Sequence, residues 1–370
     1  MRTKAFLIIS FYDEADFVTP ILLPQLYEEN MPSTIKGYAC KEKGGKLEPF
    51  EYDPGEIGAD QVEVEVEYCG ICHSDLSMID NEWGMSSYPF VPGHEAIGKI
   101  VAVGSQVSQD RIGQRVGIGW QSSSCNHCKN CGVGKEHLCL NEDEVGQTII
   151  QRNGAWADRA RVQAKWALPI PDELDPSLAG PLMCAGTTVW SPIRHHGVKA
   201  GMETAVLGVG GLGHLAVQFL SKMGTQVTGL SSTHSKEEQT RKLGATDFIA
   251  TKENPEDLEK AAGRFDFILS TVSADVDWNQ YVNALAPEGT LVICGVPDSE
   301  IHFQPFPLIV AEKKVCGGRA GAPSDTAEML AFCAKHGVEP MCEQFKLDDI
   351  NQAVQHVREG KARYRAVVEV

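Results

Sequence analysis

The sequence has little positive charge and no repetitive segments. Its 370 residues include 33 Lys and Arg but 50 Asp and Glu, which gives a formal net charge of −17. Nucleic acids and anionic membranes are bound through basic surfaces, so this balance argues against both as general partners. No internal repeat or low-complexity tract is present. The 42% of hydrophobic residues can build a sizeable core, and the length favours two domains.

The sequence also lacks a complete secretory signal or membrane span. The apolar run near the N-terminus covers only residues 5–11, and no small-residue cleavage site follows it. Residues 204–221 carry no formal charge and reach the minimum length of a span, but His214, Gln218 and several glycines suit a tight turn better than a bilayer. We therefore expect a cytoplasmic protein. Residues 1–30 are interpreted as an N-terminal extension of unknown role.

Cysteine is too dilute for a small disulfide scaffold, since the whole chain has twelve. Four of them lie within fifteen residues, at Cys125, Cys128, Cys131 and Cys139. These spacings let a short loop wrap four thiolates around one tetrahedral ion, which favours a closed structural Zn²⁺ site. An iron–sulfur cluster could use the same residues, but nothing else in the chain calls for an electron carrier. Free or metal-bound thiols fit the reducing cytoplasm.

Hydrophobic periodicity divides the chain into two halves. Residues 61–68 alternate between apolar and polar, which predicts a half-buried strand, and residues 90–185 are rich in glycine and short β-type runs. After residue 185, strand and helix patterns alternate, which predicts parallel βαβ units. Strands are expected at 205–207, 226–230, 247–249, 265–269, 290–296 and 314–316, and helices at 212–223, 236–243 and 325–336. The final apolar run, 364–368, could join either half.

A glycine-rich loop lies between the first strand and helix of the second half. Its residues Gly208, Gly210, Gly211, Leu212 and Gly213 fit the pattern G-x-G-x-x-G. In this context the motif predicts dinucleotide binding, with the tight turn at the first glycine and close phosphate approach at the second. The helix N-terminus would then offer N–H groups to the phosphates. A glycine-rich turn without a ligand is the alternative.

The residues after the next strand favour NADPH over NADH. An NAD site usually has a carboxylate about twenty residues past the first glycine. Here the stretch contains Ser231, Ser232, Thr233 and Lys236 and no carboxylate. Hydroxyls and a cation suit a 2′-phosphate. A polar turn that caps the next helix would explain the same residues, and both roles are compatible.

Further residues of zinc-binding type are scattered through the chain, at Cys72, His94, Glu95 and Cys184. A single Cys or His is usually packed core, so spacing alone leaves these residues open. Cys69 and Cys72 form a CxxC pair, but a redox pair needs a helix start to lower a thiol pKa. This pair follows the predicted strand at 61–68, which argues against redox chemistry.

Taken together, these motifs resemble those of the zinc-containing medium-chain alcohol dehydrogenases. The resemblance is strongest to the cinnamyl-alcohol-dehydrogenase-like, NADPH-dependent aldehyde reductases. The resemblance covers about residues 33–370. It rests on CGICHSD at 69–75, PGHEAIG at 92–98, the four-cysteine lobe, GPLMCAG at 180–186, the glycine loop and residues 231–236.

The resemblance implies an α/β protein with two domains. A Rossmann domain with a doubly wound parallel sheet, residues 186–322, would bind NADP(H), and a mostly β, GroES-like catalytic domain would combine residues 31–185 and 323–370. Each chain would hold two Zn²⁺ ions, the catalytic one on Cys72, His94 and Cys184 with Glu95 beside it, and Ser74 would belong to a proton relay. Such proteins are commonly homodimers or homotetramers.

The implied reaction transfers hydride between NADPH and a primary alcohol/aldehyde pair, with zinc polarising the carbonyl oxygen. Two positions depart from the family pattern. Ser77 stands where a relay histidine is frequent, and Glu144 where lignin-type members carry a Trp of the substrate pocket. We therefore expect broad specificity for small-molecule aldehydes. The alternatives are a zinc-independent NADPH quinone or enone reductase of the same fold and a non-catalytic NADPH-binding redox sensor.

The cysteine spacing yields a first prediction. We expect Cys128→Ser to lose metal from the lobe and to lower the free energy of unfolding by at least about 2 kcal/mol, because a structural ion contributes directly to folding. Urea titration and metal analysis measure the two effects. A variant with normal stability and unchanged metal content would show that the lobe is not a structural site.

Overall fold

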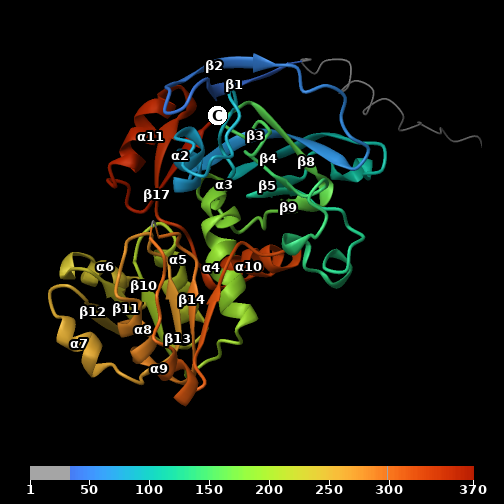
Figure 1. Cartoon of the computed structure of the whole chain (residues 1–370). Helices are drawn as coiled ribbons and strands as arrows, with labels where there is room; N and C mark the ends of the chain where they lie inside the picture. Colours follow the sequence, from blue (N-terminus) through green and yellow to red (C-terminus); the bar gives the residue numbers. More distant parts are fainter. Residues whose placement is uncertain (1–33, 298) are drawn as a thin grey trace, which may run out of the picture. The chain divides into compact units, whose positions relative to one another are not determined.

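A computed structural model describes residues 34–297 and 299–370. The interpretation of residues 1–30 as an extension lies outside the described residues. Two large sheets organise the described chain (Figure 1). No helix within it combines the length and the apolar character that crossing a membrane requires.

The second half of the chain forms a six-stranded parallel sheet in the order β12-β11-β10-β13-β14-β15. Numbered along the chain, this order is 3-2-1-4-5-6, the doubly wound arrangement of dinucleotide-binding folds. The predicted βαβ alternation is therefore confirmed. The strands are β10 (Glu203–Leu207), β11 (Gln226–Ser231), β12 (Asp247–Ala250), β13 (Phe265–Ser270), β14 (Leu285–Ile293) and β15 (Lys314–Gly317).

Helices connect the successive parallel strands. In α5 the predicted apolar face is buried, with Leu215, Ala216, Phe219 and Leu220 in the core. The strand expected at 290–296 is wrong at both ends, because β14 covers Leu285–Ile293. After Ile293, the backbone N–H groups of Cys294 and Gly295 both donate to the carbonyl of Ser270, where the ladder ends. The connecting helices are α5 (Gly213–Lys222), α6 (Glu237–Lys242), α7 (Pro255–Lys260), α8 (Trp278–Ala284) and α9 (Pro305–Val310).

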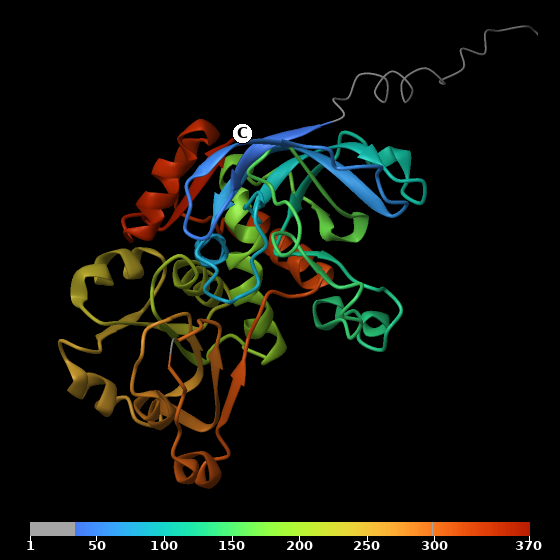
Figure 2. The same ribbon diagram turned by 45° about the horizontal axis from the view of Figure 1, so that its top comes forward.

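The other large sheet has the order β16-β17-β3-β4-β5-β9, with β8 also paired to β3. Its pairs are antiparallel except β16 with β17. The C-terminal strand therefore lies in this sheet, a placement that periodicity alone left open. In Figure 2 the red C-terminal segment lies beside the blue strands of the first half of the chain. The strands are β3 (Gln61–Ile71), β4 (Ala96–Val103), β5 (Arg115–Ile118), β8 (Arg159–Gln163), β9 (Ala167–Pro169), β16 (Cys342–Lys346) and β17 (Arg365–Glu369).

Smaller elements complete the described chain. Two short antiparallel pairs are formed by β1 with β2 and by β6 with β7. These elements are β1 (Ile35–Cys40), β2 (Leu47–Tyr52), β6 (Gln121–Ser123), β7 (Gly146–Gln147), α2 (His73–Ile79), α3 (Pro176–Ala179), α4 (Ala185–His195), α10 (Pro323–His336) and α11 (Ile350–Arg358).

The alternation in β3 holds for the valines but not for every glutamate. Val62, Val64 and Val66 are buried as predicted, yet Glu63 is buried as well. Its carboxylate pairs with Arg159, at 2.6 Å, and with Arg161, both on the neighbouring strand β8. A buried carboxylate needs such partners, and the pattern within one strand does not reveal them.

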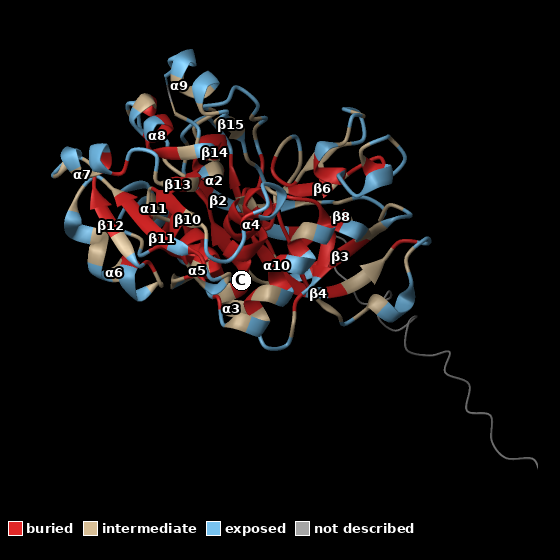
Figure 3. Cartoon of the chain, turned by 90° about the horizontal axis from the view of Figure 1, so that it is seen from below, coloured by how far each residue is buried: buried red, intermediate tan, exposed pale blue. Residues whose placement is uncertain are grey.

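Buried residues follow the strands of both sheets (Figure 3). One hydrophobic cluster spans the two halves, since it includes Ile97 of β4, Trp190 of α4, Val206 of β10 and Met329 of α10. α4 and α10 also share a hydrogen bond of 2.9 Å between the hydroxyls of Thr187 and Thr326. The two helices thus join the sheets into one packed unit.

His214 in α5 adds a polar connection between the halves. Its Nε2 accepts a hydrogen bond from the backbone N–H of Met341, at 3.2 Å, so Nδ1 carries the proton and donates to the carbonyl of Gly210, at 3.0 Å. The ring also stacks on Tyr364. Burial lowers the pKa of His214 to about 4. The neutral ring therefore holds the glycine loop against the segment that enters β16.

This pKa predicts a pH-dependent stability. Between pH about 4 and 6.5 the unfolded chain binds a proton at His214 that the folded protein does not, so stability falls as pH falls through this window. His214→Gln should remove this contribution, about 2 kcal/mol between pH 7 and pH 5. Urea unfolding at both pH values measures it, with the exposed His302→Gln as control. Equal pH dependence in His214→Gln and wild type would contradict the assignment.

Candidate functional site

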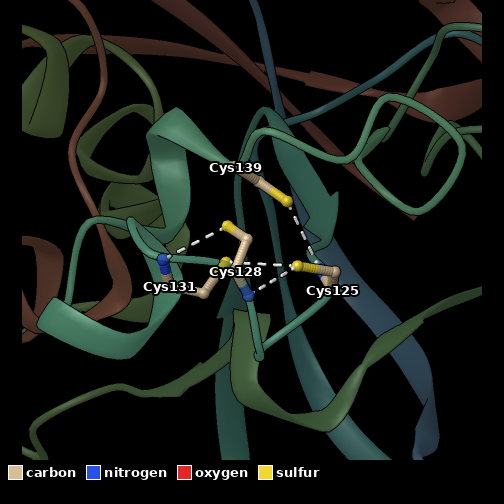
Figure 4. Close-up of side chains that lie close together, drawn as sticks. All are labelled: Cys125, Cys128, Cys131 and Cys139. Atoms are coloured by element: carbon tan, nitrogen blue, oxygen red, sulfur yellow. Dashed lines mark hydrogen bonds between the residues drawn. The ribbon is translucent and has the colours of Figure 1, made fainter.

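The four clustered cysteines converge in a loop between β6 and β7 (Figure 4). Their sulfur atoms all lie within 4.8 Å of one another, and the Sγ atoms of Cys125 and Cys131 are 3.8 Å apart. Backbone N–H groups donate to these sulfurs, including that of Cys128 to Cys125, at 3.3 Å. Hydrogen bonds from the backbone lower the pKa of Cys128 to about 6. A sulfur separation of about 3.8 Å matches two ligands of a tetrahedral zinc ion.

A second cluster joins four residues from three separate segments, since His94 and Glu95 are neighbours in the chain. The candidate ligand atoms of Cys72, His94, Glu95 and Cys184 lie within 4.8 Å of one another, and all four residues are buried. The two thiols are 3.9 Å apart, and Nε2 of His94 is 3.2 Å from Sγ of Cys184. Two sulfurs and one imidazole nitrogen at these distances have the composition and spacing of an open zinc site.

Asp75 determines which ring nitrogen of His94 is directed at the thiols. Its Oδ1 lies 2.8 Å from Nδ1 of the imidazole and also accepts the Gly93 N–H, while Oδ2 accepts the Cys72 N–H. This leaves Nε2 directed at Cys184. Burial alone would lower the pKa of His94, but Asp75 and the Cys72 thiolate raise it well above its usual value. A carboxylate behind an imidazole is a recurrent arrangement at zinc sites.

The two thiols of this cluster have different acidities. The hydrogen bond from Cys184 lowers the pKa of Cys72 well below its usual value, and the same bond raises the pKa of Cys184. Cys72 is therefore the more acidic thiol of the pair, and Cys184 keeps its proton longer. Loss of that proton leaves two thiolates, which are the ligands that zinc prefers.

Glu95 connects this cluster to the C-terminal strand. One of its carboxylate oxygens, Oε1, pairs with the Arg365 guanidinium of β17, and both side chains are buried. Oε2 is buried without a hydrogen-bond partner in the described part of the chain. Burial raises the pKa of Glu95 against the opposing charge of Arg365. An unpartnered buried oxygen beside two thiols is an additional donor for a metal ion.

Two serines of α2, Ser74 and Ser77, make different contacts. The Ser74 hydroxyl is 3.8 Å from the Cys72 sulfur and half-buried, so it borders the cluster. The Ser77 hydroxyl instead donates to the carboxylate of Glu82, at 2.6 Å.

Cys72 caps the start of α2, so the expectation that this thiol lies away from a helix start is wrong. Its partner in the CxxC pair, Cys69, is fully buried on β3, where burial raises the thiol pKa well above its usual value. Cys72 meets Cys184 across the fold. A redox role for the pair therefore finds no support in this geometry.

The glycine loop borders a pocket of about 360 Å³ at the carboxyl ends of the parallel strands. Gly208 has φ +89°, a conformation that favours glycine, and a Cβ on Gly213 would lie 1.9 Å from the Gly208 carbonyl oxygen. Gly210 faces open space, with no atom within 4 Å of a Cβ there. Gly208, Gly210, Gly211 and Leu212 line the pocket, whereas Gly213 lies behind it at the start of α5.

Polar residues line the other end of this pocket. Ser231, Ser232 and Lys236 are among them, and Lys236 Nζ donates to the Val209 carbonyl, at 2.9 Å. Burial lowers the pKa of Lys236. Thr233 is not among the residues that line the pocket, and its hydroxyl lies 2.8 Å from that of Ser235. Lys252 lines it and was not predicted.

Sequence reasoning missed three residues of the second cluster and the glycine-loop pocket, namely Asp75, Lys252 and Arg365, and it left Trp120 open between a pocket wall and core packing. The Trp120 ring meets His94 edge-on, with ring centroids 5.1 Å apart, and Trp83 meets Trp120. Asp75 stands three residues after Cys72, so its position in the CGICHSD motif was a usable signal. The other three reach the sites through folding, and Arg365 is 270 residues from Glu95.

Known dehydrogenases resemble this chain in sequence and in fold. The family models described as "Alcohol dehydrogenase GroES-like domain" and "Zinc-binding dehydrogenase" match residues 58–172 and 211–335. "Aldehyde reductase AdhA" of Synechocystis sp. is 45% identical over 334 residues, covering 90% of this chain and 98% of that protein. "NADP-dependent alcohol dehydrogenase C 1" of Mycolicibacterium smegmatis is 39% identical over 343 residues, covering 91% and 98%.

Solved structures show the same fold. A cinnamyl alcohol dehydrogenase from Sorghum bicolor superposes with a TM-score of 0.85 at 33% identity, covering 91% of this chain and 97% of that one. A crystal structure of CAD from Helicobacter pylori complexed with NADP(H) gives a TM-score of 0.83 at 29% identity, covering 92% of this chain and 99% of that one.

Proposed function

The chain belongs to the zinc-containing medium-chain alcohol dehydrogenase family, and we propose that it is an NADPH-dependent aldehyde reductase. The observation that carries this proposal is the convergence of Cys72, His94 and Cys184 in one buried cluster. A zinc-independent quinone or enone reductase would not need these three ligands or the cysteine lobe. A redox sensor would not need a serine hydroxyl beside them.

We propose two zinc ions per chain. Cys125, Cys128, Cys131 and Cys139 would hold a closed structural ion, since four sulfurs fill a tetrahedral shell. Cys72, His94 and Cys184 would hold the catalytic ion and leave one position open, with the Oε2 atom of Glu95 as an alternative ligand. When bound, the catalytic zinc supplies a Lewis acid for the carbonyl oxygen and NADPH supplies the hydride.

The chain's own groups would orient and protonate the substrate. Ser74, half-buried and beside Cys72, is the hydroxyl that passes a proton to the product oxygen. Ser77 is engaged with Glu82 and has no part in this transfer. Ser74 therefore exchanges its proton with water or with a cofactor hydroxyl, without the histidine that many relatives use. Asp75 keeps the imidazole of His94 oriented.

The pocket beside the glycine loop would bind NADP(H). The open space at Gly210 and the N–H groups at the start of α5 would receive the pyrophosphate. Ser231, Ser232 and Lys236 would receive the 2′-phosphate, and Lys252 adds a second cation on that side. Thr233 contributes through the turn that it forms with Ser235.

The substrate pocket would favour an apolar or aromatic aldehyde. Trp120 lies against the imidazole of His94, and Trp83, which is more exposed, packs on Trp120. Two indoles provide an apolar wall beside the reacting carbon. Glu144 replaces the family tryptophan and bonds to Asn141 on the lobe, which removes one aromatic wall. A pocket with fewer walls accepts a broad range of aldehydes.

We also propose that the chain forms a homodimer or homotetramer in the cytoplasm. Strand β15 lies at an edge of the parallel sheet, and the adjoining α9 exposes Phe306, Ile309 and Val310. An exposed apolar patch beside a sheet edge is typical of an interface between subunits. The twelve thiols favour a reducing compartment.

Activity assays test the proposed reaction. The wild-type enzyme should reduce aliphatic and aromatic aldehydes with NADPH, and Cys184→Ala should lose at least about 1,000-fold in kcat/KM, because a zinc ligand is gone. The variant should lose one equivalent of zinc and retain NADPH binding. Cys316→Ala, outside both clusters, is the control. Undiminished aldehyde reduction by Cys184→Ala would refute the zinc assignment, and turnover of quinones or enones alone would favour the zinc-independent alternative.

Cofactor selectivity tests the phosphate site. Lys236→Ala should lower the NADPH/NADH ratio of kcat/KM by about 10- to 100-fold, because one charge-assisted hydrogen bond to the 2′-phosphate is lost. Lys242→Ala is the matched control, since this exposed lysine of α6 pairs with Glu238. An unchanged ratio in Lys236→Ala would remove Lys236 from the phosphate site.

A further inference from the structure

A third group of metal-binding side chains lies outside both zinc clusters. It consists of His137, His195 and Asp325, whose candidate ligand atoms lie within 4.8 Å of one another. His137 belongs to the cysteine lobe, in the short helix η3 (Glu136–Leu138), His195 is the last residue of α4, and Asp325 lies in the first turn of α10. The group thus joins three segments that are far apart in the sequence.

The distances within the group approach those of a coordination shell. Nε2 of His195 lies 3.1 Å from Oδ1 of Asp325, and the rings of His137 and His195 stack with centroids 5.9 Å apart. Ligand atoms about 2.1 Å from a tetrahedral zinc ion are about 3.4 Å apart. His195 is 43% exposed in its side chain, so it can rotate to close the remaining gap.

One atom of the group lacks the partner that burial normally requires. His137 is only 5% exposed, and its Nδ1 has no hydrogen-bond partner among residues 34–297 and 299–370. A buried polar atom without a partner is costly and points to a group that is bound when the protein is loaded. The carboxylate of Asp325 has partners at both oxygens, since Oδ2 accepts the Ala322 N–H and Oδ1 lies beside Nε2 of His195.

We propose that His137, His195 and Asp325 form a third metal site, which binds zinc or a similar divalent transition-metal ion. Two imidazoles and one carboxylate are a common zinc ligand set. The carboxylate of Asp325 supplies negative charge, and Arg319 is a nearby cation that keeps the affinity below that of the thiolate sites. His195 leaves the site open to water, so the ion exchanges while the two thiolate-bound ions remain.

This ion would hold the cysteine lobe to the helices that join the two sheets. α4 begins directly after Cys184, and α10 packs against it through Thr187 and Thr326. A metal bond from His137 to these helices would therefore restrain the lobe relative to the catalytic cluster. The proposal is independent of the proposed reaction, because it concerns binding and stability.

Metal titration of the full-length chain without a histidine tag tests the proposal. The protein is purified with its two tight zinc ions, dialysed against a weak chelator and titrated with Co²⁺, followed by isothermal calorimetry and by visible absorption. We expect one additional equivalent to bind in wild type. His195→Gln should weaken it at least tenfold, and Asp325→Asn should do the same while its amide oxygen keeps the cap on Ala322. Added Zn²⁺ should raise the Tm of wild type but not of His195→Gln.

His302→Gln is the matched control, since this histidine is 81% exposed and outside the group. It should bind the additional equivalent as wild type does. Two outcomes would overturn the proposal: no additional equivalent in wild type, or an equivalent that both His195→Gln and Asp325→Asn retain with unchanged affinity. Aldehyde reduction does not enter this comparison, so failure here leaves the proposed reaction untouched, and failure of the reaction leaves this site untouched.

Discussion

The guanidinium of Arg365 is buried and pairs with the carboxylate of Glu95. It lies between that carboxylate and the glycine-rich loop. A Cβ on Gly211 would lie 3.1 Å from its Nη1 atom, so the same cation touches the nucleotide loop. Two thiols, a carboxylate and an anionic cofactor would otherwise concentrate negative charge in one place. Removing either partner of such a buried pair costs about 3–5 kcal/mol, because the other charge is left uncompensated.

The position of Arg365 depends on the topology of the chain. It begins β17, the strand that returns from α11 and pairs with β3 in antiparallel register. The Ala366–Ile71 pair of that ladder sets Arg365 next to the end of β3, close to Cys72. His214 strengthens the same junction from the other side, where it bonds to Gly210 and to Met341. The Met341 carbonyl in turn accepts the Arg365 N–H, so the glycine loop, the cluster around Cys72 and the C-terminal strand form one connected region.

Local patterns predicted much of the architecture. The βαβ alternation, the amphipathic helix at α5 and the strand at β3 depend on periodicity, which acts within one element, and the structure confirms them. The end of β14 and the burial of Glu63 were missed because they depend on hydrogen bonds and charges from neighbouring strands. The same limit applies to Lys252 and Trp120, which reach the sites from segments that carry no motif of their own.

The sequence by itself determined the chemistry that is available here. Four cysteines in one short loop must meet, because their spacing leaves little freedom, and a glycine loop between strand and helix must present its N–H groups. The tertiary structure alone decided that Cys72 would meet Cys184, 112 residues away, and that Asp75 would turn Nε2 of His94 toward them. It also brought His137, His195 and Asp325 together. Contacts of this kind depend on how helices and sheets pack, and no local spacing encodes that packing.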